Sequence, residues 1–235
     1  MSTVSPHPVR LEGALDSQLS RWLWVVKWLL AIPHFIVLFF LAIAFVLLTI
    51  VAFFAILFTE RYPRGIFDFN VGVMRWAWRV SFYTYDALGT DRYPPFSLGL
   101  EPDYPATLDV AYPEKLSRGL VLVKWWLLAI PHYFVLGIVV GGGLLSWERT
   151  WNHGHGGWHW NPGLISLLVL FAGISLLFTE RYPLGIFALV MGLNRWVFRV
   201  VAYSALMTDV YPPFRLDQGG LEETSPVPVE SHAPL

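Results

Sequence analysis

The sequence contains no cysteine, and only 14% of its 235 residues are charged. The absence of cysteine excludes disulfide bonds, thiol catalysis and cysteine-based metal sites. Soluble globular domains carry about 25% charged residues, so this chain has too little polar surface to remain soluble alone in water. Its net charge of -1 gives no indication of nucleic-acid binding.

Motifs of the common enzyme classes are also missing. The chain has no GxSxG, no GxxxxGKS or GxxxxGKT, no GxGxxG after a strand and no HExxH. Its long apolar stretches contain no acidic residue, which argues against an ion-coupled transporter with buried carboxylates. We therefore expect a protein that is not an enzyme and that uses no cofactor.

Apolar and aromatic residues are abundant. Hydrophobic residues make up 55% of the sequence and aromatic residues 17%, including 12 Trp, and the mean hydropathy is +0.52. Trp and Tyr concentrate where membrane proteins meet lipid headgroups, so these values predict an integral membrane protein. Residues 1–19 are polar and lack the features of a secretory signal, residues 1–7 are expected to form an N-terminal tail, and residues 218–235 are predicted to be disordered.

Several motifs recur in the same order, which predicts two tandem copies of one unit, residues 8–101 and 102–217. LFTERYP occurs at Leu57–Pro63 and again at Leu177–Pro183. KWLLAIPH is matched by KWWLLAIPH, RWAWRV by RWVFRV, and TDRYPPF by TDVYPPF. The second copy has an additional segment rich in Gly, His and Trp, Gly141–Gly163, which is predicted to be a loop.

Each copy has a long apolar stretch before LFTERYP. In the second copy the loop divides this stretch into two candidate spans, about 120–145 and 164–178. In the first copy, residues 22–58 form either a hairpin that turns near 40–44 or one tilted span with an interfacial prefix. Charge favours hairpins, because two hairpins place every Lys and Arg except Arg149 on the cytoplasmic side. We predict an all-α, multi-pass protein of the cytoplasmic (inner) membrane, with four spans and both termini in the cytoplasm.

A different kind of helix is predicted after each hairpin. From residue 65 to residue 88, polar residues recur at helical spacing on one face, which favours an amphipathic helix on the cytoplasmic membrane surface. In the alternative, the helix dips into the bilayer with Arg75 and Arg79 paired inside the bundle. Gly72 and Gly192 permit close helix packing, which favours a homo-oligomer or a larger complex. Period-two alternation in VRLE and ATLDVAY predicts two short paired strands.

Arginine and tryptophan side chains near the predicted headgroup level are the candidate contacts for lipid or for a partner: Arg61, Arg75, Arg79, Arg181, Arg195, Arg199, Trp76 and Trp196. Glu60 and Glu180 end apolar helices, where the helix dipole disfavours a carboxylate. We therefore predict that each glutamate forms an ion pair with Arg75, Arg79 or their counterparts. A role as a proton or substrate carboxylate is the alternative.

Histidines provide two further candidates. His34 and His132 follow a proline in each copy, and they either hydrogen-bond a freed carbonyl group or line a path or metal site between the copies. His153, His155 and His159 lie in the Gly141–Gly163 loop. They either bind Zn or Cu, or belong to a Trp-rich loop in the outer headgroups.

Taken together, LLAIPH, LFTERYPxGIF, GxxRWxxRVxxY and DxYPPF resemble the bacterial membrane family described as domain of unknown function 4389, over about residues 8–216. The resemblance implies short membrane hairpins followed by amphipathic helices, and it implies no reaction. We expect a non-catalytic accessory or scaffolding subunit that contacts anionic lipid, other membrane subunits or a second copy. The alternatives are a small transporter or channel with a path between the copies, and a metal-binding protein that uses the outer loop.

Overall fold

The computed structural model describes residues 7–141 and 163–217. In chain order its elements are β1 (Val9–Gly13), α1 (Leu23–Thr59), α2 (Arg64–Tyr83), β2 (Ala106–Val110), α3 (Arg118–Val123), the π-helical segment η1 (Lys124–Leu128), α4 (Ile130–Val139), α6 (Leu164–Thr179) and α7 (Leu184–Ser204). The two predicted strands are confirmed, because β1 and β2 pair antiparallel with Leu11 opposite Leu108. The fold is therefore mostly helical with a small sheet, and the all-α prediction is corrected in this respect.

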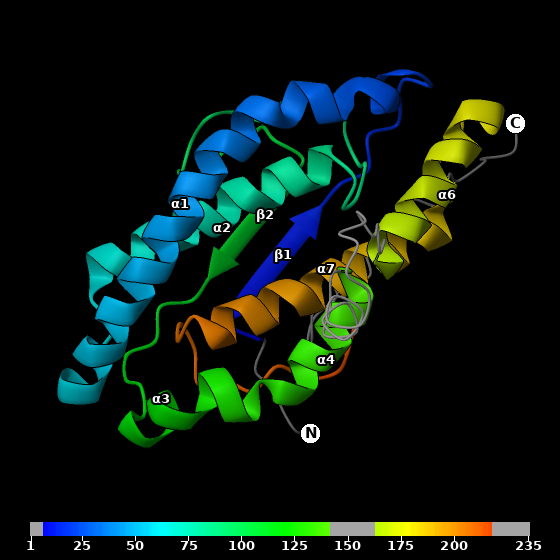
Figure 1. The fold of residues 1–235 in the computed structure, drawn as a ribbon. Coiled ribbons are helices and arrows are strands. Elements are labelled where there is room, and N and C mark those ends of the chain that lie inside the picture. The colour runs from blue at the N-terminus through cyan, green and yellow to red at the C-terminus, as the bar shows by residue number, and fades with distance from the viewer. Residues whose placement is uncertain (1–6, 142–162, 218–235) are drawn as a thin grey trace, which may run out of the picture.

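The elements form three layers. The strands alternate, so that Val9, Leu11 and Leu108 face the core while Arg10 and Asp109 face outward. Helix α2 packs on β2 and α7 packs on β1, and α1 and α6 pack in turn on α2 and α7. In Figure 1 the sheet lies between α2 and α7, and all these elements run roughly parallel to one long axis. Each strand thus packs on the helix of the other half of the chain, where the halves are residues 8–101 and 102–217.

Helix α1 continues without interruption for 37 residues. The predicted turn near 40–44 is wrong, and so is the first hairpin. The segment FFLAIAF contains no Gly, Pro or Asn to end a helix, and an apolar helix keeps its backbone hydrogen bonds internal. At 1.5 Å per residue, α1 is about 55 Å long.

Helix α1 is the first of two rods in the molecule. The second, here called the segmented rod, consists of α3, η1, α4 and α6 and runs antiparallel to α1. At its start, an Arg118 guanidinium nitrogen donates to the Phe58 carbonyl oxygen near the end of α1, at 3.2 Å. At its far end, Glu180 forms an ion pair with Arg21, which precedes α1. Figure 1 shows α4 and α6 end to end, with α6 continuing away from α3. The predicted second hairpin is therefore also wrong.

The π-helical segment η1 accommodates the additional tryptophan of KWWLLAIPH. A π-helical turn is the usual way in which a helix absorbs one inserted residue. Lys124 and His132 are therefore placed as Lys27 and His34 are, although one more residue separates them. A bend of 43° follows η1 next to Pro131, whereas α1 continues through Pro33.

Among the residues that the structure describes, two helices are long and apolar enough to cross a membrane, α1 and α7, and a third candidate arises if α3 to α4 counts as one bent span. These helices indicate a membrane location. Half of the apolar 18-residue stretch of α7 is buried inside the molecule, whereas only 6% of the corresponding stretch of α1 is buried. The rods therefore provide most of the apolar surface.

Helices α2 and α7 lie in the middle layer and not on a membrane surface, which corrects the prediction of two interfacial helices. Most of the C-terminal half of α2 is buried, including Trp78 and Arg79. The alternative in which Arg75 and Arg79 are enclosed by the protein is closer to the structure. Gly72 and Gly192 are packed against Leu98 and Leu216 of the same chain, so the close approach that they permit is internal.

Candidate functional site

Buried lysine pairs tie both rods to the rest of the molecule. Lys27 is fully buried; its Nζ lies 2.8 Å from a carboxylate oxygen of Asp91 and donates to the Thr90 carbonyl oxygen at 2.6 Å. The second half repeats this arrangement with Lys124, Thr208 and Asp209. A buried charge is tolerated when it is paired in this way, so these lysines hold the rods in place. Sequence reasoning missed both pairs, although KW and TD recur in both copies.

Each histidine of the IPH motif lies among aromatic rings of its own half. His34 Nδ1 accepts a hydrogen bond from Trp76 Nε1 at 3.0 Å, and its ring stacks on Phe96 with centroids 4.0 Å apart. His132 has corresponding neighbours in Trp196, Tyr211 and Phe214. The two histidines lie in separate aromatic clusters, and no group of three metal-ligating side chains occurs in the described part of the chain. His153, His155 and His159 lie outside the described residues.

Arg75 and Arg195 hold the outer edges of the sheet. Arg75 Nε donates to the Leu108 carbonyl oxygen at 2.9 Å, and its guanidinium lies 2.5 Å from the Asp109 carboxylate. Arg195 Nε donates to the Leu11 carbonyl oxygen at 3.2 Å. Each arginine therefore binds the strand of the opposite half.

Four of the predicted lipid contacts are buried: Arg79, Arg199, Trp76 and Trp196. Arg79 is 2% exposed and donates to the Ser97 carbonyl oxygen. Burial lowers the pKa of Arg79, and the nearby Glu101 carboxylate acts in the opposite direction. These four side chains do not reach the surface, so the prediction that they contact lipid phosphates directly is wrong. Arg61 and Arg181 are exposed and stay predicted contacts.

Glu60 and Glu180 form ion pairs between the halves, and their partners differ from those predicted. A carboxylate oxygen of Glu60 lies 2.8 Å from Lys115 Nζ, and the other lies 3.3 Å from Arg118 Nε. Glu180 pairs with Arg21, which matches Arg118 in the repeat alignment. Each glutamate adopts the left-handed conformation, with φ of 59° and 58°, and thereby ends its helix and turns toward the other half. Arg75 and Arg79 are not the partners because they face the sheet and the segment after YPPF.

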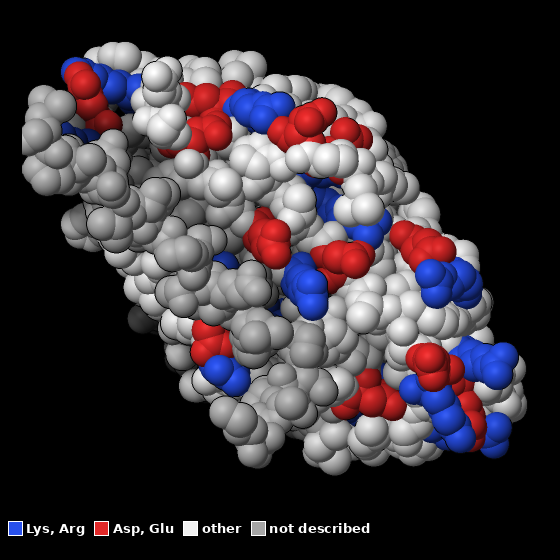
Figure 2. Space-filling model, turned by 180° about the vertical axis from the view of Figure 1, so that it is seen from behind, with Lys and Arg blue, Asp and Glu red and all other residues white. Residues whose placement is uncertain are grey.

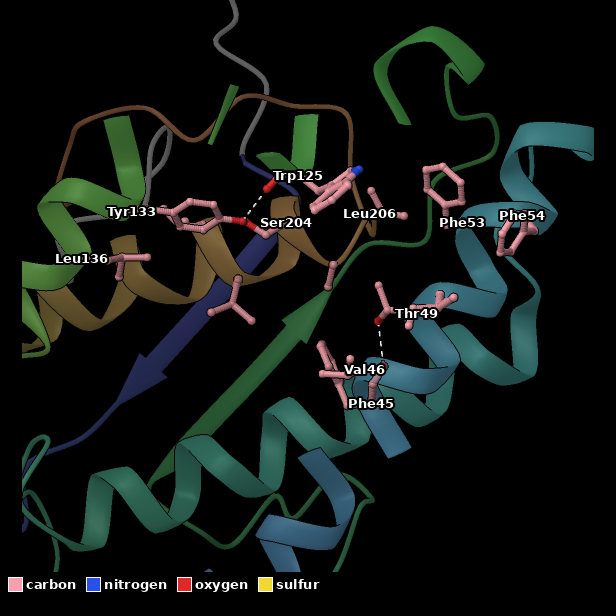
Figure 3. Close-up of a pocket in the computed structure, with 14 residues that line it drawn as sticks. Phe45, Val46, Thr49, Phe53, Phe54, Trp125, Tyr133, Leu136, Ser204 and Leu206 are labelled. Atoms are coloured by element: carbon pink, nitrogen blue, oxygen red, sulfur yellow. Dashed lines mark hydrogen bonds between the residues drawn. The ribbon is translucent and has the colours of Figure 1, made fainter. Parts of the chain in front are cut away.

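An open groove of about 640 Å³ lies between the two rods. Figure 3 shows α1 side chains such as Phe53 on one side and side chains of η1, α4 and α7 on the other. The lining is almost wholly apolar, and its volume lies within the ~300–1,000 Å³ range of small-molecule sites. Its few hydroxyl groups are mostly satisfied locally: Thr49 donates to the Phe45 carbonyl oxygen and Tyr133 to that of Trp125.

The corresponding place at the other end of the rods is occupied by side chains that the second half lacks. There the indole ring of Trp24 lies against Gly173. A Cβ added at position 173 would be 3.4 Å from that ring. Tyr85 Oη donates to the Trp24 carbonyl oxygen at 2.7 Å. By the motif alignment Trp24 corresponds to Val121, and Tyr85 belongs to a two-residue insertion in the first half. The groove is thus a difference between the halves and not a consequence of the shared fold.

Long apolar helices such as α1 are a feature of membrane-associated proteins. The family model described as Domain of unknown function (DUF4389) matches residues 21–97 and 163–215, and the chain belongs to this family. The two matched segments are consistent with two tandem copies. No curated protein and no solved structure matches the chain.

Proposed function

We propose that this chain is a non-catalytic membrane protein that binds lipid and serves as an accessory or scaffolding subunit in the cytoplasmic membrane. The groove between the rods carries the proposal. Its lining side chains Val46, Ile50 and Phe54 are also exposed on the outer face of α1, so the groove opens where acyl chains would lie. An acyl chain is the ligand that an open and almost wholly apolar groove favours.

A non-catalytic role is supported by the way in which buried charges are used. Lys27 and Lys124 are held by carboxylates, and Arg79 and Arg199 by backbone carbonyl oxygens. Catalytic and transport sites place charged groups toward a cavity, whereas no charged side chain lines this groove in the described part of the chain. These groups thus act in holding the layers together.

The exposed arginines at the ends of the rods are the proposed contacts for lipid headgroups or for a partner subunit. Arg61 and Arg181 follow the last turns of α1 and α6, and both are exposed. Guanidinium groups at such positions suit lipid phosphates or acidic groups of a partner subunit. The proposal assigns headgroup or partner contact to these two residues.

Lipid binding is tested by purifying the chain in mild detergent and identifying the lipids that remain bound. Val201→Trp fills the groove, and Leu189→Trp introduces the same side chain at an exposed position of α7 outside it. We expect wild type and Leu189→Trp to retain the same lipids and Val201→Trp to lose most of them. Equal lipid content in all three proteins would contradict the lipid-binding role.

The accessory role is tested separately with the same preparations. A scaffold is expected to copurify with another membrane protein at fixed stoichiometry, and Arg61→Glu together with Arg181→Glu should weaken that complex or its lipid contacts. Purification of the wild type as a lipid-bound single species at low detergent would argue against a subunit role.

A further inference from the structure

The outer face of the two rods is apolar from one end to the other. On α1, exposed large hydrophobic side chains extend from Val25 to Phe58, and on the segmented rod they extend from Leu122 to Phe178. In the described residues of both rods the charged side chains are Lys27, Lys124 and Arg118. Both lysines are fully buried, and Arg118 lies at the first residue of α3. The rods therefore present an apolar face about 55 Å long.

The outer face of the sheet has the opposite character. Arg10, Glu12 and Asp109 point away from the core and are exposed. Contacts between elements run from rod to middle helix to strand in both halves, so the sheet is separated from the rods by α2 and α7. Figure 2, which views the molecule from behind, shows charged side chains from one end of the molecule to the other.

Helix α1 could stand upright across a membrane or lie flat along it. The common direction of the elements decides between these two orientations. The strands and α2 run alongside α1 (Figure 1), so an upright α1 would carry the sheet into the bilayer with it. Arg10, Glu12 and Asp109 would then stand at hydrocarbon depth, where charged side chains are costly. An upright α1 would also exceed the ~30 Å hydrocarbon core by far. A flat orientation removes both conflicts.

We propose that the molecule lies flat in a single membrane leaflet, with the two rods immersed side by side and the charged sheet face in water. The partner surface is a lipid monolayer whose acyl chains contact the outer faces of α1 and the segmented rod. Amphipathic structures of this kind sink about 5–10 Å into the headgroup and acyl boundary. The inference rests on the proposed membrane function and specifies its geometry, because the groove between the rods then opens toward the acyl chains.

Single cysteines test the orientation, since the natural sequence has none and gives no background. Gln18→Cys lies before α1 and Gly65→Cys lies after it, and both positions are exposed. Glu12→Cys reports on the outer face of the sheet, and Ile43→Cys reports on the middle of the exposed face of α1. Each full-length variant is treated with a membrane-impermeant maleimide in intact spheroplasts and in inside-out vesicles, and again in detergent, where all four should react.

The flat orientation predicts that positions 12, 18 and 65 react in one and the same membrane preparation only, and that position 43 reacts in neither. Reaction of positions 18 and 65 in opposite preparations would show that α1 spans the bilayer and would overturn the inference. Full reaction of position 43 in membranes would overturn it as well, because the rod face would then be in water. Failure of the protein to reach the membrane fraction at all would instead refute the proposed function on which the inference rests.

Discussion

Arg75 in α2 donates a hydrogen bond from Nε to the carbonyl oxygen of Leu108 in β2, at 2.9 Å. The donor belongs to the first half of the chain and the acceptor to the second. Arg195 makes the corresponding bond to Leu11 in the reverse direction. Each half therefore supplies the strand that the other half's arginine holds, and we infer that neither half is complete without its partner.

Replacing Arg75 with Leu should destabilise the protein by about 1–3 kcal/mol, because the Leu108 carbonyl oxygen loses its partner at a half-buried sheet edge. That loss corresponds to a fall in melting temperature of roughly 2–12 °C, measured in detergent by circular dichroism. Arg61→Leu is the matched control, because Arg61 is exposed, and it should change the melting temperature little. Equal effects of the two substitutions would contradict the structural role of Arg75.

Glu60 should contribute to stability only while it is ionised. The hydrogen bond from Lys115 holds the pKa of Glu60 below its usual value, with Arg118 acting in the same direction. A carboxyl group whose pKa is lowered by folding stabilises the fold above its unfolded pKa of about 4.3 and loses this effect as the pH falls. We expect Glu60→Gln to melt slightly below wild type at pH 7 and low salt.

The difference between wild type and Glu60→Gln should begin to shrink as the pH falls below the unfolded pKa of about 4.3, and it should disappear once the pH is below the lowered pKa of the folded state, where Glu60 is protonated in both states. High salt should reduce it as well, because the pair is exposed to solvent. Glu114→Gln serves as the control for a neighbouring exposed carboxylate. A melting difference that stays constant as the pH is lowered from 7 through the folded-state pKa of Glu60, located by titration, would show that the ion pairs do not stabilise the fold.

The repeat pattern predicted much of what the structure contains. LFTERYP marked the ends of α1 and α6, and the alternation in VRLE and ATLDVAY predicted the strands that pair as β1 and β2. These features depend on neighbouring residues, so a single sequence reveals them. Lys27 and Lys124 recur together with Asp91 and Asp209, so the sequence also contains a signal for the two buried ion pairs.

The hairpin prediction rested on the distribution of Lys and Arg, and the structure shows no turn within α1. Nothing within residues 40–44 ends a helix, and that local signal was the correct one. The partners of Glu60 and the groove beside Val201 depend on how one half folds onto the other. Contacts between segments more than fifty residues apart leave no periodicity in a sequence, so they required the structure.

The buried pair of Lys27 and Asp91 should behave as a unit in a double-mutant cycle. Lys27→Met leaves the Asp91 carboxylate without its closest cation, and removal of one member of a buried pair costs up to about 3–5 kcal/mol. Asp91 keeps a hydrogen bond from the Ser20 amide and is partly exposed, so we expect a loss at the lower end of that range. Adding Asp91→Asn should recover part of the loss, measured by thermal unfolding in detergent. Strict additivity of the two substitutions would contradict the pairing.

Gly72 should tolerate no side chain, whereas Gly65 on the same helix should tolerate one. A Cβ at position 72 would lie 2.9 Å from both the Cβ and the carbonyl oxygen of Leu98, and a backbone oxygen cannot move aside without shifting the YPPF segment. Overpacking of this kind costs about 1–3 kcal/mol, so Gly72→Ala should lower the melting temperature in detergent. A Cβ at position 65 meets nothing within 4 Å, and Gly65→Ala should cause no loss and a gain of up to about 1 kcal/mol from helix propensity. If Gly72→Ala were neutral in the monomer but broke a complex, Gly72 would serve association between chains and not the internal contact with Leu98.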